Sequence, residues 1–72
     1  MQPVRNVLSP REIMVLSLIA AGNSNKEIAI VLAITPETVK SHIKHILIKL
    51  TARNRAQAVS LAQRSGLLAE MS

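Results

Sequence analysis

Signals for helix starts and stops divide this 72-residue chain into four short segments and restrict it to an all-helical fold. In "SPRE", Ser9 is placed as the N-cap, a proline follows at the first helical position, and Glu12 lies where a capping box needs its acid. Thr35 and the proline after it repeat the cap, while Gly22 and Gly66 are suited to end helices. No segment has the alternating pattern of a strand. We predict a four-helix bundle with helices over about residues 10–21, 25–33, 36–50 and 55–65.

The second and fourth helices have less definite starts. Ser24 or Asn25 can cap the second helix, and Asn54 with Gln57 forms a further possible capping box before the fourth. Leu67 lies where an apolar contact often follows a helix stop. We expect an N-terminal arm or linker over residues 1–8, a single domain over 9–67 and a C-terminal tail over 68–72.

Apolar residues at the helical period give each helix an inward face. Over residues 36–50 they form one narrow stripe, in which Val39, Ile43, Ile46 and Leu50 fall at i, i+4, i+7 and i+11. Phe, Trp and Tyr are absent, so the core must be aliphatic. The inward residues expected in the first two helices are Ile13, Leu16, Ile19, Ala20, Ile28, Ala29 and Leu32.

The charge of the chain points to a polyanionic partner. Four Lys and five Arg against four Glu give a net charge of +5, which favours nucleic acid first and an anionic membrane surface second. The lack of aromatic rings argues against modules that stack single-stranded bases. The lack of Cys excludes disulfides and thiolate metal sites and favours a reducing compartment. The apolar runs are too short to span a bilayer and no signal peptide is visible, so we expect a cytoplasmic protein without a membrane partner.

The second and third predicted helices, joined by a turn of two or three residues, form a helix-turn-helix. Lys40, Ser41 and Lys44 emerge on the outer face of the third helix, opposite its apolar stripe. A recognition helix fits the ~12 Å major groove of DNA and reads base edges from its first turns. Either lysine can donate to guanine or to phosphate, and the serine allows close approach. The pattern therefore predicts sequence-specific binding of double-stranded DNA.

Helix N-termini offer a second kind of contact, because their amide groups are unpaired and the helix dipole is positive there. Asn25 and Lys26 begin the second helix, and Thr35 and Thr38 begin the third. We expect these side chains to position the DNA backbone through its phosphates. For Thr35, pure capping is an equally good explanation.

Catalytic and metal sites find little support. His42 and His45 are spaced i, i+3, but two ligands do not make a metal site, and the chain contains neither Cys nor Asp. Ser41 and His42 are adjacent in a helix, so their side chains point about 100° apart and cannot act as nucleophile and base. Glu12 is explained as a capping-box partner. We expect no enzymatic activity, no metal and no cofactor.

The segments "LSPRE", "NKEIA" and "TVKSHIKHI" closely resemble the LuxR/GerE-type helix-turn-helix domain, the DNA-binding half of many bacterial response regulators and quorum-sensing regulators. The resemblance covers roughly residues 8–67. It implies transcription regulation with the third helix in the major groove, and dimers on paired half-sites with the fourth helix at the dimer contact. Family DNA contacts match Lys40, Ser41 and Lys44 for the groove and Asn25, Lys26, Thr35 and Thr38 for the backbone.

The chain departs from this family pattern at several positions. Ile30, Val31 and Ile48 stand where relatives often carry charged or polar residues, and Thr51 stands where a helix-ending glycine is frequent. Any phosphate contact that relatives make with basic residues at positions 30 or 31 would be missing here.

Two further surfaces are candidates for protein contacts. On the fourth helix, Ala56, Val59 and Gln63 form a strip of small residues through which two copies could pack as a homodimer. Met14 and Leu18 lie opposite the predicted inward face of the first helix and could dock a regulatory or receiver domain of the intact protein.

Two alternatives to DNA binding come from other functional classes. One is a small helical protein-interaction or dimerisation module that uses its outer apolar residues and does not bind DNA. The other is a set of cationic helices acting on membranes, against which the capped and terminated helices argue because they indicate a folded bundle.

Overall fold

The computed structural model describes residues 8–66 and 68, and over this range the chain forms four helices, which confirms the predicted all-helical bundle. Three of the helices end one residue before the predicted boundary, because Ala21, Ala33 and Ser65 are C-cap residues that follow the last helical residue. The helices are α1 (Pro10–Ala20), α2 (Asn25–Leu32), α3 (Pro36–Leu50) and α4 (Arg55–Arg64).

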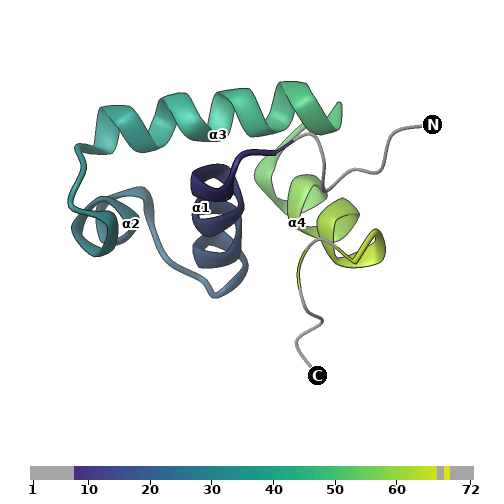
Figure 1. Ribbon diagram of the computed structural model, residues 1–72, viewed down its shortest axis with the longest axis horizontal. Coiled ribbons are helices and arrows are strands. Elements are labelled where there is room, and N and C mark those ends of the chain that lie inside the picture. The colour runs from purple at the N-terminus through teal and green to yellow at the C-terminus, as the bar shows by residue number, and fades with distance from the viewer. Residues whose placement is uncertain (1–7, 67, 69–72) are drawn as a thin grey trace.

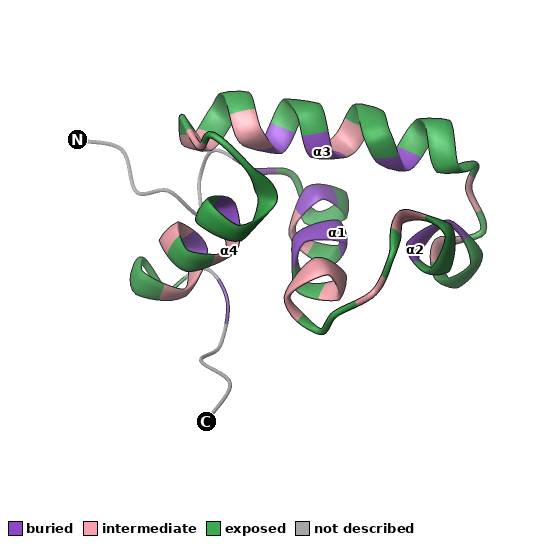
Figure 2. Cartoon of the chain, turned by 180° about the vertical axis from the view of Figure 1, so that it is seen from behind, coloured by how far each residue is buried: buried purple, intermediate pink, exposed green. Residues whose placement is uncertain are grey.

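The longest helix, α3, lies across the other three (Figure 1). It packs against α1, α2 and α4, while α1 sits between α2 and α4 and contacts both of them. Figure 2 shows the consequence for burial: the buried residues of α3 face α1 and α2, and its opposite side is exposed along its length. One whole face of α3 is therefore presented to solvent on a base of three packed helices.

Each helix begins with a side-chain cap that accepts a backbone N–H bond. Ser9 accepts from the backbone nitrogen of Glu12 at 3.1 Å, and Glu12 completes the predicted capping box. The cap of α2 is Ser24 and not Asn25, and it forms a second complete capping box with Glu27 that we did not predict. The helix starts are thus fixed locally by the sequence.

The fourth helix departs from the predicted capping box in one bond. Asn54 accepts from the backbone nitrogen of Gln57 at 2.8 Å, as expected. The side chain of Gln57 accepts instead from the backbone nitrogen of Arg53, at 2.6 Å, one residue before the cap. In a capping box the side chain of Gln57 would accept a hydrogen bond from the backbone nitrogen of Asn54. Here the backbone nitrogen of Arg53 is the donor instead.

Two helices end on residues in the left-handed region that are not glycine. Ala33 after α2 has φ of 56° and Thr51 after α3 has φ of 53°. Gly22 and Gly66, predicted as helix stops, adopt positive φ angles of 94° and 81° just after α1 and α4. The positions of Ala33 and Thr51 therefore have the backbone geometry that glycine adopts most easily.

The core is aliphatic, as predicted from the composition, and it lies where α1, α3 and the two flanking helices meet. The buried residues of α3 are Val39, Ile43 and Ile46, with Leu50 half-buried at the end of the stripe. The buried hydrophobic residues are Leu8, Val15, Leu16, Ile28, Ala29, Val39, Ile43, Ile46, Ala58, Ala62 and Leu68.

The predicted inward face of α1 was partly wrong. Val15, which we did not include, is fully buried together with Leu16, while Ile13 and Ile19 are only half-buried. Leu18, expected to point outward, is half-buried and packs against the core. The reason is that α1 is surrounded by three helices, so it buries a wider face than a single stripe describes.

The packed domain extends beyond the expected boundaries at both ends. Leu8, assigned to the arm, and Leu68, assigned to the tail, are each less than a tenth exposed and belong to the core. The backbone nitrogen of Leu68 donates to the carbonyl of Ala62 at 3.2 Å, which brings the chain back onto α4. Leu67, residues 1–7 and residues 69–72 lie outside the described residues.

Among the residues that the structure describes, no helix has both the length and the apolar character needed to cross a membrane.

Candidate nucleic-acid interface

The connection between α2 and α3 is short and is held by backbone hydrogen bonds. Ala33 in the left-handed conformation ends α2, and the backbone nitrogen of Ile34 donates to the carbonyl of Ala29 at 3.0 Å. Thr35 then caps α3 at once. Ile34 is half-buried, and the small Ala29 is buried where α2 approaches its neighbours. The two helices therefore form a helix-turn-helix whose crossing is fixed by packing and by backbone bonds.

The two faces of α3 separate core from charge, as the helical period predicts. Val39 and Ile46 are essentially inaccessible to solvent. Lys40, Ser41 and Lys44, the three predicted groove-reading residues, are all exposed on the outer side of the helix. The structure thus brings the three together on one accessible surface of α3.

Lys40 has a weak intramolecular partner. Its Nζ atom lies 3.6 Å from Oε1 of Glu37, and the two side chains are 63% and 84% exposed. Exposed pairs of this kind contribute little to stability, about 0–1 kcal/mol. Lys40 can therefore leave Glu37 for a stronger anion with little loss of stability.

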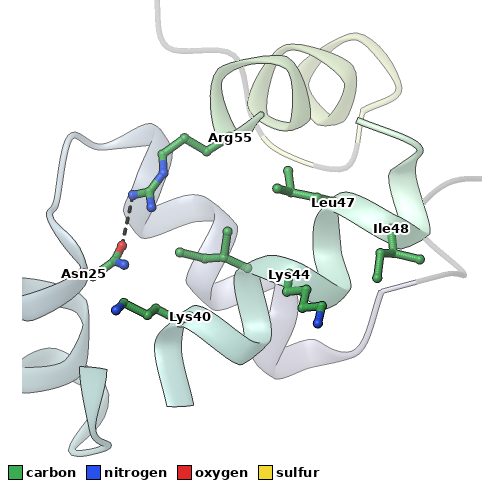
Figure 3. Close-up of a pocket in the computed structure, with 7 residues that line it drawn as sticks. Asn25, Lys40, Lys44, Leu47, Ile48 and Arg55 are labelled. Atoms are coloured by element: carbon green, nitrogen blue, oxygen red, sulfur yellow. Dashed lines mark hydrogen bonds between the residues drawn. The ribbon is translucent and has the colours of Figure 1, made fainter. Parts of the chain in front are cut away.

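A groove of about 390 Å³ runs beside these lysines and is shown in Figure 3. Its floor is apolar, and polar or cationic side chains from α2, α3 and α4 stand around it. The lining residues are Asn25, Lys40, Ile43, Lys44, Leu47, Ile48 and Arg55. The groove therefore joins the predicted base-reading residues to the start of α2 and the start of α4.

Arg55 is a member of this site that sequence reasoning missed. Its Nη1 atom donates to Oδ1 of Asn25 at 3.0 Å, which links the first turn of α4 to the first turn of α2 across 30 residues of sequence (Figure 3). A signal for it was present: α4 begins with an arginine, and among its described residues the first turn holds no acid. A cation at a helix N-terminus is electrostatically unfavourable unless an anion approaches.

Of the residues predicted to contact phosphate, Asn25 lines the same groove as the two lysines, and the others are exposed at the starts of α2 and α3. Lys26 is exposed in the first turn of α2, and Asn25 beside it is held by Arg55. Thr35 accepts from the backbone nitrogen of Thr38 at 3.1 Å, so its capping role is confirmed. The hydroxyls of Thr35 and Thr38 also lie within 2.9 Å of each other, and both side chains are exposed. The starts of α2 and α3 thus present short polar side chains next to unpaired helical amides.

The predicted dimer strip on α4 is less accessible than expected. Ala56 is exposed, but Val59 and Gln63 are half-buried, and Val59 packs against the core of its own chain. His45 is exposed and His42 is half-buried beside the core stripe of α3. Within residues 8–66 and 68, no cluster of three His, Cys, Asp or Glu side chains is placed to hold a metal ion.

Comparison with known proteins gives one consistent match. The model of the family described as "Bacterial regulatory proteins, luxR family" (GerE) matches residues 6–62. The "Transcriptional regulatory protein LiaR" of Bacillus subtilis (strain 168) is 49% identical over 61 residues, which cover 85% of this chain and 29% of that protein. The "Response regulator protein VraR" of Staphylococcus aureus (strain Mu3 / ATCC 700698) is 47% identical over 62 residues, covering 86% and 30%. The chain thus spans less than a third of the length of these relatives.

Proposed function

Because this chain belongs to the luxR family of bacterial regulatory proteins, we propose that α3 enters the major groove of double-stranded DNA and reads base edges with Lys40, Ser41 and Lys44. The family is one of DNA-binding transcription regulators, so DNA-binding transcription regulation is the function of this domain. The proposal concerns how the domain binds DNA. It includes no catalytic step, since binding alone is what these side chains supply.

The observation that carries the proposal is the exposed row of side chains opposite the buried stripe of α3. An α-helix with its side chains is about 10–12 Å across, which matches the width of the major groove. Lys40 and Lys44 lie one turn apart and are exposed, and the small side chain of Ser41 lets the helix approach the bases. A helix that was buried on all sides, or acidic on its outer face, could not bind in this way.

The starts of α2 and α3 complete the proposed interface by holding phosphates. We assign Lys26 and Asn25 to one such contact and Thr38, with Thr35, to another. Positive helix N-termini and short hydroxyl or amide side chains are frequent phosphate ligands, and they fix the register of a protein on DNA without reading its sequence. The groove residues of α3 would then supply the specificity.

Binding measurements on single-lysine variants test the base contacts. Preferred duplexes are first selected from a random pool, and the affinity of Lys40→Ala and Lys44→Ala is measured on a selected duplex and on a random duplex. We expect each variant to lose about 1–3 kcal/mol of binding free energy on the selected duplex and much less on the random one. Arg64→Ala is a matched control, because it removes the same charge from an exposed site at the far end of α4.

The salt dependence of binding separates base contacts from phosphate contacts. A lysine that contacts only phosphate should weaken binding to both duplexes equally, and its removal should make the salt slope shallower by about one. Equal losses on both duplexes would therefore move that lysine from the base-reading set to the phosphate set. Unchanged affinity of both variants on every duplex would contradict the proposed interface.

We also propose that two copies bind paired half-sites through contacts of α4. One domain of this size buries only about 600–1,000 Å² of its own surface on DNA, which is little area for selective binding. Half-sites for dimers lie about one helical turn apart. Ala56 is the exposed member of the predicted strip, so Ala56→Glu should abolish cooperative binding to a two-site duplex and leave binding to a single half-site unchanged. Sedimentation that finds independent binding of two wild-type copies would contradict the dimer.

The relatives are named as a transcriptional regulatory protein and a response regulator, and this chain matches less than a third of each. We infer that the domain works in the cytoplasm together with a regulatory or receiver domain. Met14 is 48% exposed and remains a candidate for that contact, whereas Leu18 packs against the core of the domain itself. Chemical-shift mapping with an added receiver domain should show changes around Met14, and an undisturbed α1 would contradict this assignment.

A further inference from the structure

An exposed isoleucine continues the row of proposed DNA-reading lysines on α3. Lys40, Lys44 and Ile48 are spaced by one turn each, and all three line the groove described above (Figure 3). The side chain of Ile48 is 65% exposed. It lies in the last turn of α3, whose opposite face is buried in the core. The row of α3 side chains that lines the groove is therefore cationic at Lys40 and Lys44 and apolar at Ile48.

A single exposed apolar residue is common on protein surfaces and needs no explanation by itself. Ile48 differs because it is part of a groove with an apolar floor and a cationic rim. Ile43 and Leu47 adjoin it on the floor, while Lys40, Lys44 and Arg55 supply positive charge around it. A complementary ligand must be anionic overall and must also carry a small apolar group.

Double-stranded DNA has such a group on one base only. The 5-methyl group of thymine projects into the major groove, and apolar side chains recognise it by direct contact, whereas the other base edges offer hydrogen-bonding atoms. Ile48 lies eight residues after Lys40, which corresponds to about 12 Å along the helix axis. If Lys40 and Lys44 contact bases in the major groove of DNA, Ile48 would meet a base a few pairs further along that major groove.

We propose that Ile48 is a specificity-determining residue that packs against the 5-methyl group of a thymine in the DNA site. The proposal rests on the proposed function, because it requires α3 to lie in the major groove. It adds a preference for thymine to the hydrogen-bonding preferences of the two lysines. The contact requires no ion pair, so its contribution to affinity should depend little on salt, unlike that of the lysines.

Base analogues test the methyl contact directly. Each thymine of a selected duplex is replaced in turn by deoxyuridine, which lacks only the methyl group, and then by 5-bromodeoxyuridine, which restores a group of similar size. For the wild-type domain we expect one position at which uracil weakens binding about fourfold, the effect of leaving roughly one methyl group unburied, and at which bromouracil restores the affinity. For Ile48→Ala we expect thymine and uracil to be bound equally at that position.

Two further variants make the test specific. Ile30→Ala removes a similarly exposed isoleucine, 72% accessible, from α2 outside the groove, and this variant should keep the full thymine preference. Ile48→Val keeps a branched apolar side chain, so this variant should keep most of the preference for thymine over uracil. Thermal unfolding of each variant checks the fold, and we expect it to be intact because Ile48 is mostly exposed and contributes little to the core.

Three results would overturn the proposal. The first is an Ile48→Ala variant that retains the full difference between thymine and uracil. The second is an equal loss of affinity by that variant on the selected duplex and on a random duplex, which would place Ile48 against the sugar-phosphate backbone. The third is a wild-type domain that is indifferent to uracil at every position. Failure of the proposed function looks different, because Lys40→Ala and Lys44→Ala would then bind every duplex as the wild type does.

Discussion

The Nζ atom of Lys49 lies 2.8 Å from Oε1 of Glu12, so an ion pair joins the last turn of α3 to the first turn of α1. The same carboxylate oxygen accepts the backbone N–H of Ser9 at 2.8 Å. The side chain of Glu12 is only 6% exposed, whereas that of Lys49 is 38% exposed. Glu12 therefore both caps α1 and links it to the proposed recognition helix, in addition to the apolar packing between the two helices.

Replacing Glu12 by glutamine should destabilise the domain more than the same change in the other capping box. Glu12→Gln keeps an oxygen for the backbone of Ser9 but removes the charge that pairs with Lys49. We expect a loss of about 1–2 kcal/mol in the free energy of unfolding at pH 7, because hydrogen bonds to charged groups are worth about that much and the partly exposed lysine is screened by solvent. Denaturant or thermal unfolding of the wild type and of Glu12→Gln measures this difference in the free energy of unfolding.

Glu27→Gln is the matched control for this experiment. Glu27 forms the same capping box with Ser24, but it is exposed, and the hydrogen bonds that it makes with Ser24 are local to the start of α2. A change of at most a few tenths of a kcal/mol is expected for a surface substitution of this kind. If the two glutamine variants lost the same stability, the ion pair with Lys49 would contribute nothing beyond the cap.

The stabilisation from Glu12 should disappear in acid. Burial acts to raise the pKa of Glu12, but the hydrogen bonds from Lys49 and Ser9 and the charge of Lys49 outweigh it and lower the pKa below the ordinary value of 4.5. A lowered pKa in the folded state means that the contribution is fully present above pH 4.5 and is lost as the pH falls through the folded-state pKa. The gap in melting temperature between wild type and Glu12→Gln should therefore be largest near pH 7 and shrink below about pH 4.5. A gap that stays constant between pH 7 and pH 3 would contradict a charged Glu12.

Local signals in the sequence were sufficient to predict most of the fold. The caps at Ser9, Thr35 and Asn54 involve residues three apart, and each forms as expected. The burial of Val39 and Ile43 follows from the helical period, which also places Lys40 on the opposite face. Such features depend on a few neighbouring residues, so they can be predicted before the arrangement of the helices is known.

Contacts between helices could not be predicted in the same way. Lys49 and Glu12 are 37 residues apart, and Arg55 and Asn25 are 30 apart, so nothing in the local pattern indicates that they meet. The burial of Val15 depends on α1 being surrounded by other helices, which no single-helix period describes. The sequence therefore indicated candidate residues on α2 and α3, which follow from local signals, and it missed Arg55, which α4 adds to the groove.

Glycine at position 51 should stabilise the domain. Thr51 has φ of 53°, a left-handed conformation that costs a residue with a Cβ atom about 1–2 kcal/mol, and its side chain is exposed. Thr51→Gly removes that strain but makes the unfolded chain more flexible, which opposes the gain by about 0.5–1 kcal/mol. We expect a net increase of about 0.5–1 kcal/mol in the free energy of unfolding, seen as a melting temperature higher by a few degrees.

Ala21→Gly is the control for the backbone effect. Ala21 is also an exposed C-cap, but its φ of −79° is in the ordinary right-handed region, so glycine there brings only the flexibility of the unfolded chain. The two substitutions should therefore change the melting temperature in opposite directions. A lower melting temperature for Thr51→Gly would mean that the left-handed conformation of Thr51 is not a source of strain.

Arg55 should bind a DNA phosphate, because it is the cation that α4 adds to the proposed interface. Its guanidinium is held by Asn25 at the rim of the groove that contains Lys40 and Lys44, in the first turn of a helix where positive charge is otherwise unfavourable. Arg55→Gln keeps an N–H group that can donate to Asn25 and removes the charge. We expect weaker binding by a similar factor on selected and random duplexes, and a salt slope that is shallower by about one, since one phosphate contact is lost.

The design of this experiment separates binding from folding. Arg64→Gln removes the same charge from the last turn of α4 and should leave both the affinity and the salt slope nearly unchanged. Thermal unfolding of Arg55→Gln measures any contribution of the link between α4 and α2 to stability. If Arg55→Gln lowered the melting temperature but bound random DNA with the wild-type salt slope, Arg55 would hold the two helices together without contacting a phosphate. A loss confined to the selected duplex would instead assign Arg55 to a base edge, because phosphate contacts do not distinguish sequences.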